Sequence, residues 1–362
     1  MVKTLQKIDS IQGLRAIAVV LVVYTHAIDS SMTIFSTSTQ LDFFYLENWG
    51  SIGLDLFFVI SGFIVTRIIY SYRQEDGWKV FAYKRILRII PLYWGLSIVA
   101  TILTIRTYPI RAATFVKTVL FFPIFESAFE FPVIGVGWSL SYEVYFYSIV
   151  VILLVFQARE IKLIALLLLL LLALLGTLYD SPVVILQFLT SPLLIEFALG
   201  IGCGILYDLI KTNSNSARFG MVTFSLGILT MLSSIFWNYG EISEAGSVTS
   251  SNYLAFLRSI FWGIPCSLFL LGCTLLERAY SLAIPSLLIR IGDASYSNYL
   301  LHGLLISFGR RTILELNLSA DLYILFLVIM CTAASLLMYR FVEKPLTDSL
   351  TNYFFPRKLK TT

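Results

Sequence analysis

The chain has 362 residues, of which 58% are hydrophobic and only 13% are charged. A soluble domain carries about one quarter charged residues, and its polar surface could not cover so large an apolar fraction. The composition therefore excludes a soluble globular protein, a disordered chain, a collagen and a disulfide-rich secreted scaffold. It indicates an integral membrane protein, because lipid removes the need for a polar surface.

Ten apolar runs are long enough to cross a bilayer, for which a helix needs about 20 mostly apolar residues. We therefore predict an all-α, polytopic helical bundle of about ten transmembrane helices. The predicted spans are Ile11–Ile28, Gly50–Tyr70, Ile89–Thr107, Trp138–Phe156, Leu163–Leu178, Pro192–Leu209, Phe219–Phe236, Arg258–Leu276, Ala294–Phe308 and Leu322–Tyr339.

The basic residues predict the orientation of the bundle. With a cytoplasmic amino terminus, most lysine and arginine residues fall in cytoplasmic segments, as the positive-inside rule requires. The outer side then keeps Arg106, Arg111, Lys117, Arg258, Arg310 and Arg311. We expect both termini in the cytoplasm, a single membrane domain over residues 1–346, and a short basic cytoplasmic tail over residues 347–362.

The first apolar run could instead be a signal peptide, because Lys3 and Lys7 precede it. No small-residue cleavage site follows, and Arg15 and His26 interrupt the run, so we interpret it as the first helix.

Small and sulfur-containing residues in the apolar runs have structural interpretations. The cysteines lack metal-ligand or disulfide spacing, so we predict core packing and no metal site for Cys203, Cys266, Cys273 and Cys331. Three glycines follow no strand, which argues against a dinucleotide loop and favours close helix packing at Gly200, Gly202 and Gly204.

Ionisable residues inside predicted spans are costly and are functional candidates by default. The only two histidines, His26 and His302, both lie in apolar runs. Arg15 and His26 are eleven residues apart, about three helical turns, so one helix face carries both. The structural alternatives are an arginine that extends to the lipid headgroups and a hydrogen-bonded core histidine.

A basic cluster begins the third predicted span. Arg85 and Arg88 share one helix face, and two guanidiniums there suit phosphate groups. The alternative is a positive-inside anchor.

Polar stripes occur on other spans as well. Ser139, Glu143 and Tyr147 recur every four residues, and Glu143 could orient a histidine or arginine, carry a proton or act as a structural partner. A second stripe lies in the ninth span and consists of Ser295, Asn298, Tyr299 and His302. Asp55 and Glu196 could each pair with an intramembrane arginine.

Several of these segments together resemble integral-membrane acyltransferase family 3, the bacterial polysaccharide and antibiotic O-acyltransferases. The similar segments, in order, are Gly13-Leu14-Arg15 with His26, the GLDLFFVISG run at 53–62, RxxR with Ile89, Ile90, Pro91 and Tyr93, WSLSYEVYFY at 138–147, SYSNYLLH at 295–302, and Arg340–Pro345. The resemblance covers nearly the whole chain, and it implies a location in the bacterial inner membrane.

The resemblance implies ten spans and transfer of an acyl group, usually acetyl from acetyl-CoA, to a hydroxyl of an extracytoplasmic or lipid-linked glycan. It implies that Arg15 and His26 form the paired site, that Arg85 and Arg88 handle CoA, and that Glu143 is the acid of the WSLSxE run. His302 also matches. We expect no separate soluble esterase-like domain, because only about twenty residues follow the last span. We also expect no permanently bound cofactor.

As a mechanism, we expect His26 to act as general base or as a transient acyl carrier, oriented by Asp55 or Glu143. Arg15, Arg85 and Arg88 would hold the CoA phosphates. The acceptor would meet Trp138, Ser139, Tyr142 and His302, although aromatic residues at a span edge also form interface belts. The competing function is a transporter or flippase of a glycan or lipid-linked intermediate, for which intramembrane charges are equally typical.

Overall fold

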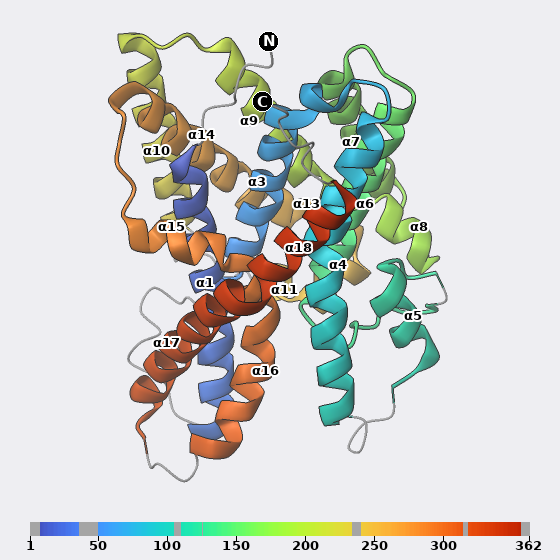
Figure 1. The fold of residues 1–362 in the computed structure, drawn as a ribbon, viewed down its shortest axis with the longest axis vertical. Helices are drawn as coiled ribbons and strands as arrows, with labels where there is room; N and C mark the ends of the chain where they lie inside the picture. Colours follow the sequence, from blue (N-terminus) through green and yellow to red (C-terminus); the bar gives the residue numbers. More distant parts are fainter. Residues whose placement is uncertain are drawn as a thin grey trace, which may run out of the picture.

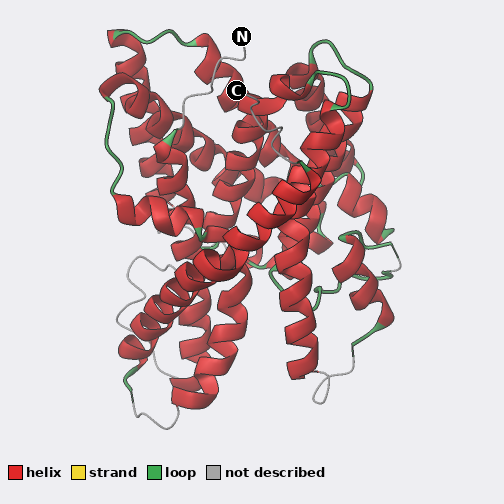
Figure 2. Ribbon diagram, viewed as in Figure 1, coloured by secondary structure: helices red, strands yellow, loops and turns green. Residues whose placement is uncertain are grey.

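The structure is a computed structural model that describes residues 8–35, 50–104, 110–124, 126–233, 240–313 and 318–355. The described residues form helices and connecting turns without a strand (Figure 2). Residues 105–107 and 234–236 of two predicted spans, Arg106, Lys3, Lys7 and residues 356–362 lie outside the described residues. The predicted all-α polytopic bundle is confirmed.

Figure 1 shows the arrangement of the helices. Their bounds are α1 Asp9–Phe35, α3 Ile52–Ile68, α4 Gly77–Thr104, α5 Ala112–Leu120, α6 Gly137–Val155, α7 Ile161–Leu178, α8 Val184–Leu189, α9 Leu194–Leu209, α10 Ser214–Ser233, α11 Gly240–Ser243, α12 Ala245–Ser250, α13 Asn252–Arg258, α14 Ile264–Tyr280, α15 Ser286–Asp293, α16 Ser295–Ile313, α17 Ala320–Met338 and α18 Lys344–Phe354.

Within the described ranges, nine helices or continuous helix pairs are long and apolar enough to cross a membrane. The ninth predicted span, Ala294–Phe308, is the helical segment that is not among them. It forms α16, whose polar stripe lowers its hydropathy. Its polar residues Ser295, Asn298 and His302 are nevertheless buried within the bundle, so the polar face of the helix points to the interior.

Two continuous helices contain a π-helical turn beside a buried charge. Residues Ser259–Gly263 join α13 to α14 directly after the buried Arg258, and Tyr339–Glu343 join α17 to α18. A π-helical turn inserts an extra residue into the helix, which changes the direction of neighbouring side chains. In the second turn, Glu343 accepts a hydrogen bond from Ser297 Oγ of α16 at 2.5 Å.

Buried apolar residues from most of the long helices form the core, in which α3 packs against both α1 and α9. A Cβ atom added to Gly62 of α3 would lie 2.2 Å from the Phe197 carbonyl oxygen, and one added to Gly200 of α9 would lie 2.1 Å from that of Val59. Predicted glycine packing is therefore confirmed for Gly200. It also holds for Gly204, which faces Thr66, but Gly202 has open space beside it.

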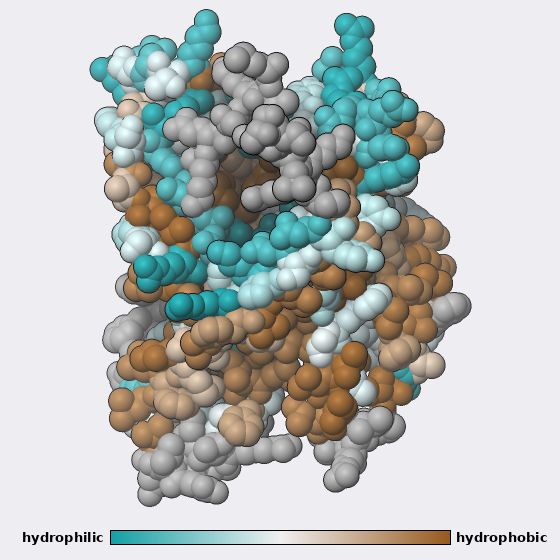
Figure 3. Space-filling model, in the orientation of Figure 1, coloured by the Kyte–Doolittle hydropathy of each residue, from teal (hydrophilic) through white to brown (hydrophobic). Residues whose placement is uncertain are grey.

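Apolar side chains cover the lower half of the face in Figure 3, over α16, α17 and the lower part of α4. The leucine-rich α7 exposes Leu167, Leu171 and Leu174 and buries Leu169 against its neighbours. These are the surfaces expected of helices that contact lipid. Of the cysteines, Cys203, Cys266 and Cys331 are buried and Cys273 is half-buried, all as free thiols, which confirms the predicted packing role.

Candidate active site

Two cavities lie inside the bundle, and together they contain most of the predicted site residues. The arginine cavity, of about 70 Å³, is lined by Arg15, Leu54, Phe57, Phe58, Ile60, Ser61, Ile64, Arg85, Arg88, Ile89, Ser139, Leu140, Glu143, Tyr147, Ser295, Tyr296 and Tyr299. The histidine cavity, of about 600 Å³, is lined by Val22, Thr25, His26, Asp29, Ser51, Leu54, Phe131, Val136, Trp138, Ser243, Glu244, Ala245, Gly246, Arg258 and Tyr299. Helix α1 contributes Arg15 to the first and His26 to the second.

Three guanidiniums meet in the arginine cavity. Arg15 comes from α1 and is 92% buried, whereas Arg85 and Arg88 come from α4. No carboxylate among the described residues forms an ion pair with any of them. Arginines that lack a counter-ion in a cavity present donor forks suited to phosphate oxygens. The arrangement therefore suits an anionic group.

Aromatic and polar groups fix the shape of the arginine cavity. The Arg85 guanidinium lies over the rings of Phe81 and Tyr147, at 5.2 and 4.9 Å from their centroids. Glu143 Oε1 accepts hydrogen bonds from Ser61 Oγ at 3.1 Å and from the Tyr147 hydroxyl at 2.6 Å. Glu143 thus joins α6 to α3 and adds negative charge to the same cavity.

His26 is held by its own helix. Its Nδ1 lies 2.8 Å from the Val22 carbonyl oxygen, one turn earlier. A carbonyl oxygen only accepts, so Nδ1 carries the proton in the neutral ring and Nε2 keeps a lone pair. The His26 ring meets that of His302 edge to face, with centroids 4.9 Å apart. His26 therefore has an oriented basic nitrogen in a cavity, which is the arrangement a general base requires.

His302 lies behind His26 and lines neither cavity. It is fully buried, its Nδ1 lies 3.2 Å from the Asn298 carbonyl oxygen, and its Nε2 has no hydrogen-bond partner among the described residues. The His302 ring contacts the His26 ring, but it does not line either cavity. This position favours support of His26 over the direct acceptor contact predicted from the sequence.

Asp55 pairs with an arginine, which is one of the two roles expected for it, and it does not contact His26. Its Oδ1 and Oδ2 each accept a hydrogen bond at 2.8 Å from Arg258, through Nε and Nη2 respectively. Both residues are almost completely buried. The orientation of His26, expected from Asp55 or Glu143, is provided instead by Val22 and His302. Glu196 lies beside this pair, and its Oε1 accepts a hydrogen bond from Ser259 Oγ at 3.3 Å.

The predicted substrate residues of α6 separate into different environments. Trp138 lines the histidine cavity, and Ser139 lines the arginine cavity with its Oγ 2.7 Å from the Tyr299 hydroxyl. Tyr142 lines neither cavity and packs against Phe58 and Phe188. Trp138 therefore fits the predicted acceptor contact, whereas Tyr142 occupies the packed core.

A charged cluster shapes the segment before α6, outside the candidate spans. Lys117 Nζ donates to Glu126 Oε2 at 3.0 Å and to the Glu130 carbonyl oxygen at 2.5 Å. Burial lowers the pKa of the Lys117 ammonium. Hydrogen bonds from Thr114 and Arg111 lower the pKa of Glu130. This network fixes the loop that carries Phe131 and Val136 to the histidine cavity.

Three further residues line the cavities although the sequence analysis gave them no role in the site. Leu54 and Tyr299 line both cavities, and Arg258 lines the histidine cavity. The signal for Arg258 was present, because it is an isolated arginine beside a long apolar run. Tyr299 belonged to a recognised polar stripe. Leu54 carried no signal, since a leucine in an apolar run is indistinguishable from its neighbours.

Comparison with known proteins agrees with the geometry. The sequence model of the acyltransferase domain, acyltransferase family 3, matches residues 8–340. The chain is 28% identical over 304 residues to the exopolysaccharide production protein ExoZ of Rhizobium meliloti, covering 82% of this chain and 89% of that protein. It is 30% identical over 159 residues to the peptidoglycan O-acetyltransferase OatA of Listeria monocytogenes, covering 39% of this chain and 23% of that protein. No solved structure matches.

Proposed function

The chain belongs to acyltransferase family 3 and is a multi-pass membrane O-acyltransferase, and from this premise we propose that it moves an acetyl group from acetyl-CoA to a glycan hydroxyl. The donor phosphates bind in the arginine cavity, and the acceptor enters the histidine cavity. The protein acts in the bacterial inner membrane, with the donor supplied from the cytoplasm.

The observation that carries this proposal is the placement of two chemically different cavities against each other. One contains three guanidiniums that form no direct ion pair with a described carboxylate, and the other contains an oriented histidine. A phosphate-bearing donor and a neutral hydroxyl acceptor require these two environments. A transporter would need no such division between anion binding and a positioned base.

The reaction needs one base and one leaving group. The acceptor hydroxyl oxygen attacks the thioester carbonyl carbon while His26 Nε2 takes the hydroxyl proton. As the new C–O bond is completed, the C–S bond breaks, and the sulfur leaves with the proton as the CoA thiol. No proton is gained or lost overall. Arg15, which lines the arginine cavity together with Arg85 and Arg88, balances negative charge on the donor phosphates.

The relatives support a cell-surface glycan as acceptor, because ExoZ is named for exopolysaccharide production and OatA for peptidoglycan O-acetylation. We propose a surface or lipid-linked polysaccharide, with O-antigen and exopolysaccharide as the first candidates. Trp138 in the wall of the histidine cavity offers a flat apolar face on which a sugar ring can stack.

The test uses bacterial membranes that contain the wild-type protein or the variant His26→Ala, supplied with radiolabelled acetyl-CoA. We expect label in the glycan fraction only with the wild type, since loss of the base removes the proton acceptor. Gly202→Ala is the matched control, because an added Cβ atom there meets open space. Its transfer should equal that of the wild type. Normal acetylation by folded His26→Ala protein would refute the base assignment, and absence of wild-type transfer would favour the transporter.

A further inference from the structure

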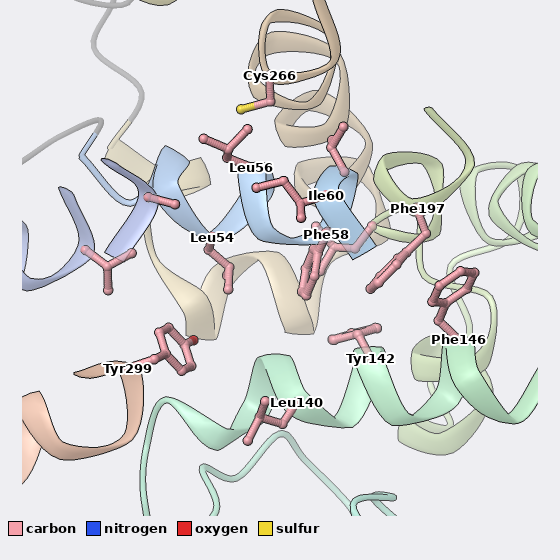
Figure 4. Close-up of a cluster of buried hydrophobic side chains, with 14 of the residues drawn as sticks. Leu54, Leu56, Phe58, Ile60, Leu140, Tyr142, Phe146, Phe197, Cys266 and Tyr299 are labelled. Atoms are coloured by element: carbon pink, nitrogen blue, oxygen red, sulfur yellow. The ribbon is translucent and has the colours of Figure 1, made fainter. Parts of the chain in front are cut away.

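Among the described residues, the two cavities share two lining residues, Leu54 of α3 and Tyr299 of α16. Both side chains are 93% buried. In Figure 4 the Leu54 side chain points from α3 towards the Tyr299 ring, with Leu140 of α6 on the far side. These two residues therefore form the wall between the arginine cavity and the histidine cavity.

The Tyr299 side of the wall is fixed to the start of α6. Its hydroxyl lies 2.7 Å from Ser139 Oγ, and both oxygens lie 3.1 Å from the Val136 carbonyl oxygen. The Phe57 ring packs against the Tyr299 ring edge to face, with centroids 6.1 Å apart. The aromatic ring is thus held from two helices. Leu54 is held by packing alone.

The proposed reaction places different demands on the two sides of this wall. The thioester comes from the arginine cavity, whereas the nucleophile is activated at His26 in the histidine cavity. The histidine cavity is large enough to contain many water molecules. Water is itself a nucleophile, and the same base that activates a sugar hydroxyl would activate it. A donor exposed to that water would be hydrolysed.

We propose that Leu54 and Tyr299 determine the choice between the glycan hydroxyl and water as acyl acceptor. This inference rests on the proposed function. The wall keeps the thioester out of the hydrated cavity until the acceptor occupies it. When the wall fails, water attacks the carbonyl carbon, the C–S bond breaks, and acetate and CoA thiol are released. Leu54 and Tyr299 are positioning residues, because they take no part in the bond changes and only control which nucleophile reaches the donor.

The experiment measures two products from the same purified protein in lipid nanodiscs with acetyl-CoA and acceptor glycan. Free acetate reports hydrolysis, and O-acetyl glycan reports transfer. We expect Leu54→Ala to raise the acetate-to-glycan ratio by about tenfold or more, because the vacated space exceeds the roughly 15 Å³ that one water needs. Tyr299→Phe keeps the ring but removes the hydrogen bond to Ser139. It should raise the acetate-to-glycan ratio by about fivefold, the change that corresponds to the loss of one hydrogen bond.

Leu56→Ala is the matched control. Leu56 lies two residues along the same helix and is equally buried, but it lines neither cavity and points towards Cys266 in Figure 4. Its ratio should equal that of the wild type, even if both rates fall. An unchanged ratio in Leu54→Ala and Tyr299→Phe, or an equal rise in Leu56→Ala, would overturn the proposal. Failure of the proposed function is distinguishable, since the wild type would then transfer nothing to glycan.

Discussion

At the residue scale, the guanidiniums of the arginine cavity are held in different ways. The Arg85 guanidinium lies against two aromatic rings. Arg15 Nη1 donates a hydrogen bond to Gln12 Oε1 at 3.3 Å. Arg88 and Arg15 repel each other, and Glu143 and Glu343 partly offset this repulsion. Like charges gathered in this manner are stabilised when a phosphate binds between them.

Replacement of Arg88 by alanine should therefore weaken donor binding. One lost charge-assisted hydrogen bond corresponds to about 1.5–3 kcal/mol, or about 10- to 100-fold in kcat/KM for acetyl-CoA, mainly through KM. Steady-state kinetics at varied acetyl-CoA would measure the change. Arg290→Ala removes an exposed arginine of α15 that lines neither cavity, and serves as the control. An unchanged KM for Arg88→Ala would exclude Arg88 from donor binding.

At the element scale, the Asp55–Arg258 pair joins the first turn of α3 to the end of α13. Arg258 Nη1 also donates to the Ile242 carbonyl oxygen at 2.9 Å, which adds the end of α11 to the same junction. The π-helical turn that follows Arg258 lets the chain continue as α14 without withdrawing the guanidinium. Arg258 also lines the histidine cavity, so the integrity of this junction affects the shape of the proposed acceptor site.

Breaking this buried pair should destabilise the bundle. Asp55→Leu leaves a buried guanidinium unpaired, and the expected loss is about 3–5 kcal/mol in the free energy of unfolding. Thermal unfolding in detergent, followed by intrinsic tryptophan fluorescence, would detect it. The double variant Asp55→Leu with Arg258→Met should regain most of the stability, because no charge is then left without a partner. A single variant as stable as the wild type would show that the pair contributes nothing.

At the scale of the whole molecule, the connections between helices gather at two ends. In Figure 1 the connection from α3 to α4 lies at the upper end, whereas the segment between α5 and α6 lies in the lower half. The lower flank is apolar in Figure 3, and the hydrophilic side chains gather above it. The positive-inside pattern predicts that the upper end is cytoplasmic.

Accessibility of introduced cysteines would test this orientation. Ala128→Cys, between α5 and α6, should react with a membrane-impermeant maleimide in intact cells, whereas Gln74→Cys, between α3 and α4, should react only after the inner membrane is permeabilised. Both positions are exposed, and the native thiols are buried or half-buried, so background labelling should be low. Labelling in the reverse order would invert the topology and place the arginine cavity away from cytoplasmic acetyl-CoA.

The sequence by itself determined the class of protein and the helices, because lipid requires long apolar runs and leaves each intramembrane charge conspicuous. It also placed Arg15 and His26 on one face of α1, since both belong to a single helix. Only the tertiary structure decided that Asp55 pairs with Arg258, that the His302 ring contacts the His26 ring, and that Leu54 and Tyr299 line both cavities. These contacts join residues far apart in the chain, and they depend on how helices pack rather than on the spacing within any one of them.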